Sequence, residues 1–90
     1  MANPFKENES IFYQDFSGAV ALRGLALHLY NENWRVNLSK ICGYLDDKHY
    51  QIAIDMIKHY RKNGENCPVF MKVCSKLQGA FWEERPRNEG

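Results

Sequence analysis

The sequence carries almost no net charge, few cysteines, few prolines and no long hydrophobic run. Its 12 basic and 11 acidic side chains leave a formal net charge of +1, without the basic excess typical of proteins that package nucleic acid. The longest apolar stretch, residues 18–22, ends at Arg23 and is far shorter than the roughly 20 residues of a membrane span. We therefore expect a protein that has no contact with a membrane.

The cysteines are Cys42, Cys67 and Cys74, an odd number that does not suggest a disulfide framework. The first seven residues lack the regions of a secretory signal peptide. The sequence therefore predicts reduced thiols in a cytoplasmic protein. It contains no Cys-x-x-Cys pair and no His-x-x-x-His pair, so we predict neither a metal site nor a cofactor.

Catalytic motifs are also missing from the sequence. It has no glycine-rich phosphate loop, and nothing in it marks an activated thiolate for a Cys–His nucleophile pair. Its 90 residues make one small domain, and few enzymes build a substrate pocket from so short a chain. The sequence favours a binding module over an enzyme.

Apolar residues with helical spacing dominate the first two thirds of the sequence. Four of them between residues 22 and 29 follow the i, i+3, i+4, i+7 pattern of a helix that faces a core. Asp15 or Ser17 can cap this first helix, and residues 31–33 end it. Gly24 inside the helix costs about 1 kcal/mol relative to alanine, which indicates the close approach of another element.

Two further helices are predicted after Trp34, which we expect to anchor the chain beneath the second helix. Asn37 can cap this short second helix over residues 38–45. A third helix over residues 46–62 begins with two aspartates, which suit the positive end of the helix dipole, and Gly64 ends it. Its buried face should hold His49, Ala53, Met56, Ile57 and Tyr60.

After Pro68 the apolar pattern changes to a period of two. Residues 69–74 alternate between two faces, which predicts a β-strand. Residues 75–79 can turn the chain, and residues 80–84 can return as a second strand. We therefore expect a β-hairpin at the end of the domain.

The polar ends of the chain set the expected domain boundaries. We predict a flexible N-terminal arm over residues 1–10 and a polar C-terminal tail over residues 85–90. The folded domain should span residues 11–84. It would begin with residues 11–13, either as a short strand or as a segment packed on the core.

Three helices followed by a hairpin describe a winged helix-turn-helix, an α+β fold that is mainly helical. Residues 11–64 resemble the winged helix-turn-helix domain of phage and plasmid replication-associated proteins, through Arg23-Gly24-Leu25, Asn33-Trp34, Ser39 and Gly64. The resemblance implies a phage or plasmid protein that binds duplex DNA through its third helix and its wing, in control of replication or transcription. We expect a homodimer, because one such domain contacts few phosphates.

The expected DNA-binding surface combines donors for base edges with basic side chains for phosphates. Gln51 is suited to reading adenine, and Lys48 or Lys58 could meet guanine or phosphate. The alternative is that this side of the third helix is only its solvated face, with Asp46 and Asp47 as a cap. The candidate DNA-binding residues are Ser39, Lys40, Lys48, Gln51, Lys58, Arg61, Lys62, Lys72, Lys76, Arg85 and Arg87.

A second hypothesis is a protein-interaction module with the same fold that does not bind DNA, such as a phage adaptor or inhibitor that binds a host protein. Both faces of the expected hairpin carry bulky side chains, so one face could meet a partner or a second copy of the chain. The candidate interface residues are Tyr50, Ile54, Phe70 and Trp82.

Overall fold

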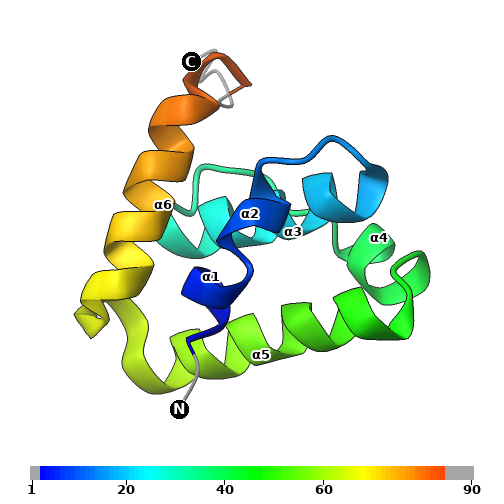
Figure 1. Ribbon diagram of the computed structural model, residues 1–90, viewed down its shortest axis with the longest axis horizontal. Helices are drawn as coiled ribbons and strands as arrows, with labels where there is room; N and C mark the ends of the chain where they lie inside the picture. Colours follow the sequence, from blue (N-terminus) through cyan, green and yellow to red (C-terminus); the bar gives the residue numbers. More distant parts are fainter. Residues whose placement is uncertain (1–2, 85–90) are drawn as a thin grey trace.

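The computed structural model describes residues 3–84, and this part of the chain is mainly helical, with no strand (Figure 1). The central helix α3 packs against α2, α4, α5 and α6. Among residues 3–84, none of the helices combines the length and the apolar character needed to cross a membrane. In chain order the elements are α1 (Pro4–Glu7), α2 (Glu9–Phe12), α3 (Ser17–Tyr30), α4 (Leu38–Gly43), α5 (Asp47–Asn63), the 3-10 turn η1 (Gly64–Asn66), α6 (Pro68–Ala80) and the 3-10 turn η2 (Trp82–Glu84).

The first described residues form two short helices instead of the flexible arm that the sequence predicted. The Oδ1 atom of Asn3 accepts hydrogen bonds from the backbone N–H groups of Phe5 and Lys6, at 3.0 and 3.3 Å, and so caps α1. Phe5 and Phe12 are fully buried, and α1 packs against α5 and α6. Two buried phenyl rings therefore attach this polar stretch to the core. Residues 11–13 end α2 and do not form a strand.

Helix α3 matches the first predicted helix over most of its length. It ends at Asn31 as predicted, but it starts after Phe16, and neither predicted side chain caps it. A Cβ atom added to Gly24 would lie 3.2 Å from the carbonyl oxygen of Arg35. The close approach expected at this glycine is therefore confirmed, and the approaching element is the link between α3 and α4.

Helices α4 and α5 begin at the predicted caps. The Oδ1 atom of Asn37 accepts a hydrogen bond from the N–H of Lys40 at 3.1 Å. The Oδ1 atom of Asp46 accepts one from the N–H of His49 at 2.9 Å. The predicted stop at Gly64 is confirmed as well. This residue has a φ angle of 54°, a value that glycine adopts easily and residues with a Cβ atom rarely adopt.

One side of α5 is buried and the other is exposed, as the sequence predicted, but the buried face is shifted. Ala53 and Met56 are fully buried as expected. Ile52 is also buried, whereas Ile57 is exposed and His49 is only partly buried. Tyr60 is partly buried and packs against the core ring of Phe70, so the core contact of α5 runs from Ile52 to Tyr60.

Residues 68–80 form helix α6, so the predicted β-hairpin wing and the winged helix-turn-helix fold are wrong. Cys67 caps the helix through Sγ, which accepts a hydrogen bond from the N–H of Phe70. Pro68 follows at the first helical position, where its missing N–H costs nothing. The buried residues of α6 are Phe70, Val73, Cys74 and Leu77, which have the i, i+3, i+4, i+7 spacing of a helix.

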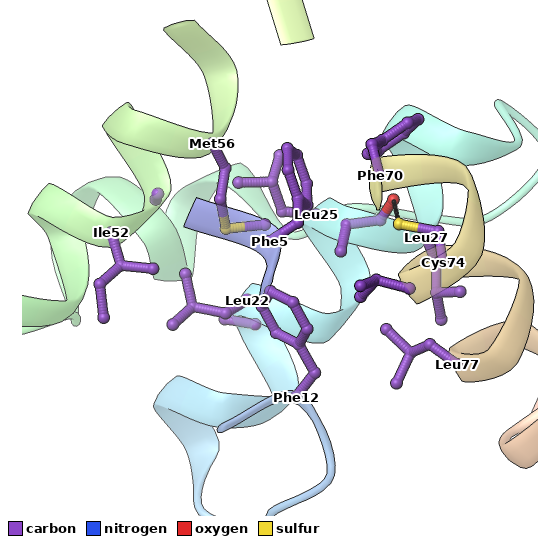
Figure 2. Packing of buried hydrophobic residues seen from close by; sticks show 14 of the residues in the cluster. Phe5, Phe12, Leu22, Leu25, Leu27, Ile52, Met56, Phe70, Cys74 and Leu77 are labelled. Carbon is purple, nitrogen blue, oxygen red and sulfur yellow. Dashed lines mark hydrogen bonds between the residues drawn. The ribbon is translucent and has the colours of Figure 1, made fainter. Parts of the chain in front are cut away.

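The core lies where α1, α2, α3, α5 and α6 meet, and Figure 2 shows their buried side chains pointing toward one another. The rings of Phe5 and Phe70 pack edge to face with their centroids 4.7 Å apart, which joins the first and the last α-helix of the described chain. Phe70 is fully buried, so its predicted role in a protein interface is wrong.

Candidate functional site

A cavity of about 450 Å³ lies between the middle of α3, the α3–α4 link and the end of the described chain. Three cationic side chains line it: Arg23 from α3, Arg35 from the link and Lys40 from α4. Within residues 3–84, Glu84 is the only carboxylate in its lining. Trp34 contributes an apolar wall. Concave sites with a few converging polar groups are the usual form of a ligand-binding site. We call this site the cationic cavity.

The guanidinium of Arg23 is fixed at the cavity by four neighbours. Its Nη1 donates to the carbonyl oxygens of Phe12 and Gln14, at 3.2 and 3.1 Å. Its Cζ lies 3.9 Å from the ring centroid of Phe81, and its Nη2 lies 3.7 Å from Oε1 of Glu84. Burying a charged group costs free energy unless it is paired and hydrogen-bonded. These contacts explain how Arg23 can be only 6% exposed.

The α3–α4 link forms a second wall of the cavity and is held in place at Trp34 and Arg35. The indole Nε1 of Trp34 donates to Oε1 of Gln78 on α6 at 2.9 Å. Nδ1 of His28 donates to the carbonyl oxygen of Trp34 at 2.7 Å. The backbone of Arg35 rests against Gly24. The backbone that carries Arg35 is therefore fixed, while its exposed side chain remains free to reorient.

The cationic cavity has positive charge in excess. Arg35 and Lys40 make no ion pair with any carboxylate among residues 3–84, and both are exposed. The single carboxylate in the lining, Glu84, pairs with Arg23. Two cations are therefore left to attract an anion. Charge-assisted hydrogen bonds from such groups to a carboxylate or a phosphate are among the stronger ones in proteins.

One exposed apolar side chain lines the cationic cavity, and a second follows a lining residue in the sequence. Val20 lines it and is 41% exposed, and Leu38, which is 56% exposed, lies in sequence between two residues of the lining, Asn37 and Lys40. We call Val20 and Leu38 the apolar rim. Tyr44 at the end of α4 is 81% exposed. Exposed apolar side chains therefore lie near the start of α3 and at both ends of α4.

The predicted DNA-binding residues of α5 share its exposed side, so sequence periodicity placed them correctly on the surface. Gln51 is already engaged, because its Nε2 donates to Oδ1 of Asp55 at 2.9 Å. DNA binding by this side of α5 stays a prediction. The exposed residues are Lys48, Gln51, Lys58, Arg61 and Lys62.

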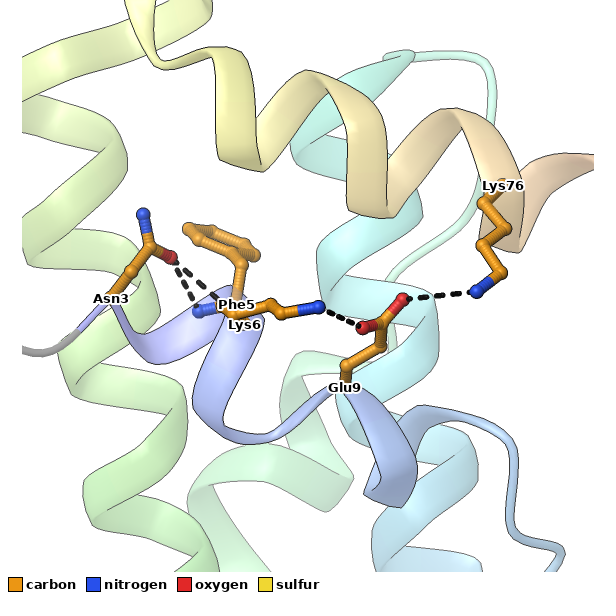
Figure 3. A network of polar contacts seen from close by, with 5 residues as sticks. All are labelled: Asn3, Phe5, Lys6, Glu9 and Lys76. Carbon is orange, nitrogen blue, oxygen red and sulfur yellow. Dashed lines mark hydrogen bonds and ion pairs between the residues drawn. The ribbon is translucent and has the colours of Figure 1, made fainter.

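The remaining predicted DNA-binding residues do not form a wing. Lys72 and Lys76 lie on α6, and Lys76 is 3.8 Å from Glu9, which also pairs with Lys6 at 3.3 Å (Figure 3). Ser39 is exposed on α4 beside Lys40, which belongs to the cationic cavity. The other two candidates, Arg85 and Arg87, lie outside the described residues. The expected surface of a helix and a wing is therefore not formed.

The predicted protein-interface residues are also dispersed. Tyr50 is exposed and Ile54 is partly buried on α5, while Trp82 is exposed in η2. The hairpin that was expected to present Phe70 and Trp82 together is not formed, because Phe70 lies in α6 and faces the core. The expected homodimer stays a prediction.

Sequence reasoning did not identify Arg23 and Arg35 as site residues. A signal was available for Arg23, because it is the one charged residue in the most apolar part of the sequence, and a buried cation needs a partner. No pattern marked Arg35, since the fold alone brings it beside Lys40.

No protein-family model, curated protein or solved structure matches this chain. The resemblance to domains of phage and plasmid replication-associated proteins therefore stays a prediction about origin, and it no longer extends to the winged fold.

Proposed function

We propose that this protein is an interaction module that binds an acidic, apolar segment of a partner protein at the cationic cavity. The supporting observation is that Arg35 and Lys40, which make no ion pair among residues 3–84, line one concave site together with the exposed side chain of Val20. A carboxylate of the partner binds between the two cations. An apolar side chain next to that carboxylate packs on Val20 and Leu38.

The energetics favour this kind of ligand. A hydrogen bond to a charged group contributes about 1.5–3 kcal/mol, and burial of apolar surface contributes about 25 cal/mol per Å². The fixed guanidinium of Arg23 and the anchored α3–α4 link limit the conformational entropy lost on binding. Neither contribution alone gives a stable complex, so the segment must supply both charge and apolar surface.

Duplex DNA is the less favoured ligand. Phosphate backbones attract cations but give no reason for apolar side chains beside them. Helix α5, which the sequence suggested as the DNA-binding helix, begins with Asp46 and Asp47. The carboxylates of these two residues repel phosphate. DNA binding is therefore the alternative outcome of the test below.

The test uses an array of short synthetic peptides that alternate Glu or Asp with Leu or Phe, and measures binding by fluorescence anisotropy. Matched arrays replace either the acidic residues by Gln or the apolar residues by Ser. The wild-type chain is compared with the double variant Arg35→Glu/Lys40→Glu. A second double variant, Lys58→Glu/Lys62→Glu, makes the same change of charge on α5 and is the control.

We expect the acidic, apolar peptides to bind wild type and the α5 variant, and to bind Arg35→Glu/Lys40→Glu at least tenfold more weakly, about 1.4 kcal/mol. The proposal fails if no acidic, apolar peptide binds or if the two variants behave alike. Binding of a generic DNA duplex that is lost in Lys58→Glu/Lys62→Glu, with an affinity that falls steeply with salt, would support the DNA hypothesis instead.

A further inference from the structure

Three nitrogen atoms converge on the sulfur of Cys67, where α1, α5 and α6 meet, and all three are N–H donors when His59 carries a proton on Nε2. Nε2 of His59 lies 3.3 Å from Sγ, Nδ2 of Asn3 lies 3.4 Å from it, and the backbone N–H of Phe70 donates to it at 3.4 Å. A neutral thiol is a weak acceptor and makes little use of three donors. A thiolate makes use of all three, and it is the form of cysteine that acts as a nucleophile.

His59 is held in place for proton transfer with this sulfur. The edge of its ring packs against Phe5 with centroids 5.8 Å apart, and Nδ2 of Asn63 donates to its carbonyl oxygen at 3.2 Å. Nδ2 of Asn3 lies 3.3 Å from His59 Nε2, the same nitrogen that faces Cys67. A thiol within hydrogen-bond reach of an imidazole is an arrangement in which the imidazole can take the thiol proton.

A cavity borders this cluster on the side of Asn3 and His59. Cys67 is partly exposed, and a cavity of about 500 Å³ is lined by its neighbours Asn3 and His59. The same cavity is lined by two lysines and two carboxylates: Lys58, Lys62, Glu7 and Asp55. Walls of both charge signs suit a peptide-like molecule that carries both ammonium and carboxylate groups.

A metal ion is a poorer occupant. Structural zinc sites use four protein ligands and catalytic zinc sites use three. Among residues 3–84, no group of three or more His, Cys, Asp or Glu side chains is placed to hold a metal ion.

We propose that Cys67 is a redox-modification site that reacts with small, peptide-like disulfides such as oxidised glutathione. His59 takes the thiol proton, and the thiolate attacks one sulfur of the disulfide. A bond forms between Cys67 and that sulfur while the original S–S bond breaks. The departing thiolate takes the proton from His59. One disulfide and one thiol are consumed, and one mixed disulfide and one thiol are produced, so no other oxidant is required.

The other two cysteines make this proposal testable within one molecule. Cys42 is exposed and has no hydrogen-bond partner among residues 3–84. Cys74 is buried, which raises the pKa of its thiol to about 12, and its Sγ donates to the carbonyl oxygen of Ala26 at 3.6 Å. Exposure alone predicts that Cys42 reacts first. The geometry at Cys67 predicts that Cys67 does.

The experiment incubates the reduced full chain with excess oxidised glutathione at about pH 7, where an ordinary thiol is only about 3% ionised. Mass spectrometry of quenched, digested samples gives the rate at each cysteine. We expect Cys67 to react about tenfold faster than Cys42, and Cys74 not to react in the folded protein. The proposal is overturned if Cys42 reacts as fast as Cys67.

Two variants test the activation of Cys67. Circular dichroism checks that each variant is folded. His59→Gln removes the base and should bring the rate at Cys67 down to that of Cys42. Asn3→Asp keeps the oxygen that caps α1 but replaces the amide donor by a carboxylate, and should slow Cys67 several-fold. His49→Gln, another histidine change on α5, is the control and should leave Cys67 unchanged. Wild-type rates in both test variants would contradict the proposal.

Discussion

The indole N–H of Trp34 donates to the side-chain oxygen of Gln78 at 2.9 Å, and this bond connects the α3–α4 link to α6. Gln78 also accepts a hydrogen bond from Nδ2 of Asn31 at 3.4 Å. One glutamine on α6 therefore holds two residues of the link, both of which precede Arg35. The shape of the cationic cavity depends on this connection.

Replacing Trp34 by phenylalanine keeps an aromatic ring but removes the N–H donor and part of the buried volume. We expect Trp34→Phe to lower the free energy of unfolding by about 2 kcal/mol, measured by urea denaturation. Tyr44→Phe also removes one polar group from an aromatic side chain, but at an exposed position, and should change stability by less than about 0.5 kcal/mol. Equal losses in the two variants would contradict this role of Trp34.

Phe5 tests whether the start of the chain belongs to the core. Because its ring is fully buried against Phe70, Phe5→Ala should lower the free energy of unfolding by about 3–5 kcal/mol. Glu7→Ala changes an exposed residue of the same helix and should have an effect below about 0.5 kcal/mol. A loss below about 1 kcal/mol for Phe5→Ala would indicate a loosely attached α1.

Replacing the glycines at the ends of α5 and α6 by alanine should change the stability of the protein in opposite directions. Gly64 has φ 54° and ψ −141°, a conformation that strains any residue with a Cβ atom, so Gly64→Ala should cost about 1–3 kcal/mol. Gly79 lies in α6 with open space around an added Cβ, so Gly79→Ala should stabilise by about 0.5–1 kcal/mol. Thermal unfolding of both variants checks the two signs.

Asp46 should make the stability of α5 depend on pH. The pKa of Asp46 is lowered from its ordinary value of 3.8, first by the backbone hydrogen bond from His49 and then by the hydrogen bond from the His49 ring. A carboxyl with a lowered pKa stabilises the fold above its unfolded value, and this contribution is lost as the pH falls through the folded value. NMR titration of the carboxyl should give a pKa below 3.8.

The variant Asp46→Asn checks the same assignment through stability. Asparagine can still cap α5 but does not titrate, so the variant should lose less of its stability than wild type between about pH 5 and pH 2. The same loss in both proteins would show that other carboxyls account for the acid sensitivity.

The sequence predicted α3, α4 and α5 because their signals are local. The caps at Asn37 and Asp46 and the stop at Gly64 depend on residues within one turn of each helix end. The glycine at position 24 even indicated a tertiary contact, since only a close approach justifies its cost inside a helix.

The ends of the fold could not be predicted in the same way. Residues 69–74 satisfy both a strand and a helical pattern, and only the extension of the apolar spacing to Leu77 separates the two. Phe5 lies in a polar stretch, and its burial depends on α5 and α6, which come much later in the chain. Long-range packing decides both cases.

The candidate sites show the same limit. The sequence identified the cations on α5 from periodicity, but the cationic cavity and the Cys67 cluster each combine residues from three segments. In both, the chemistry comes from side chains that tertiary structure brings together. A scan for motifs therefore finds neither.

The ring pair of Phe5 and Phe70 also constrains how this protein folds during synthesis on the ribosome. A nascent chain that has released only its first five helices lacks α6, the helix that carries Phe70, Val73 and Leu77 into the core. Until α6 emerges from the exit tunnel, Phe5 and the central helix expose apolar surface that chaperones recognise. The core can close only after α6 has emerged.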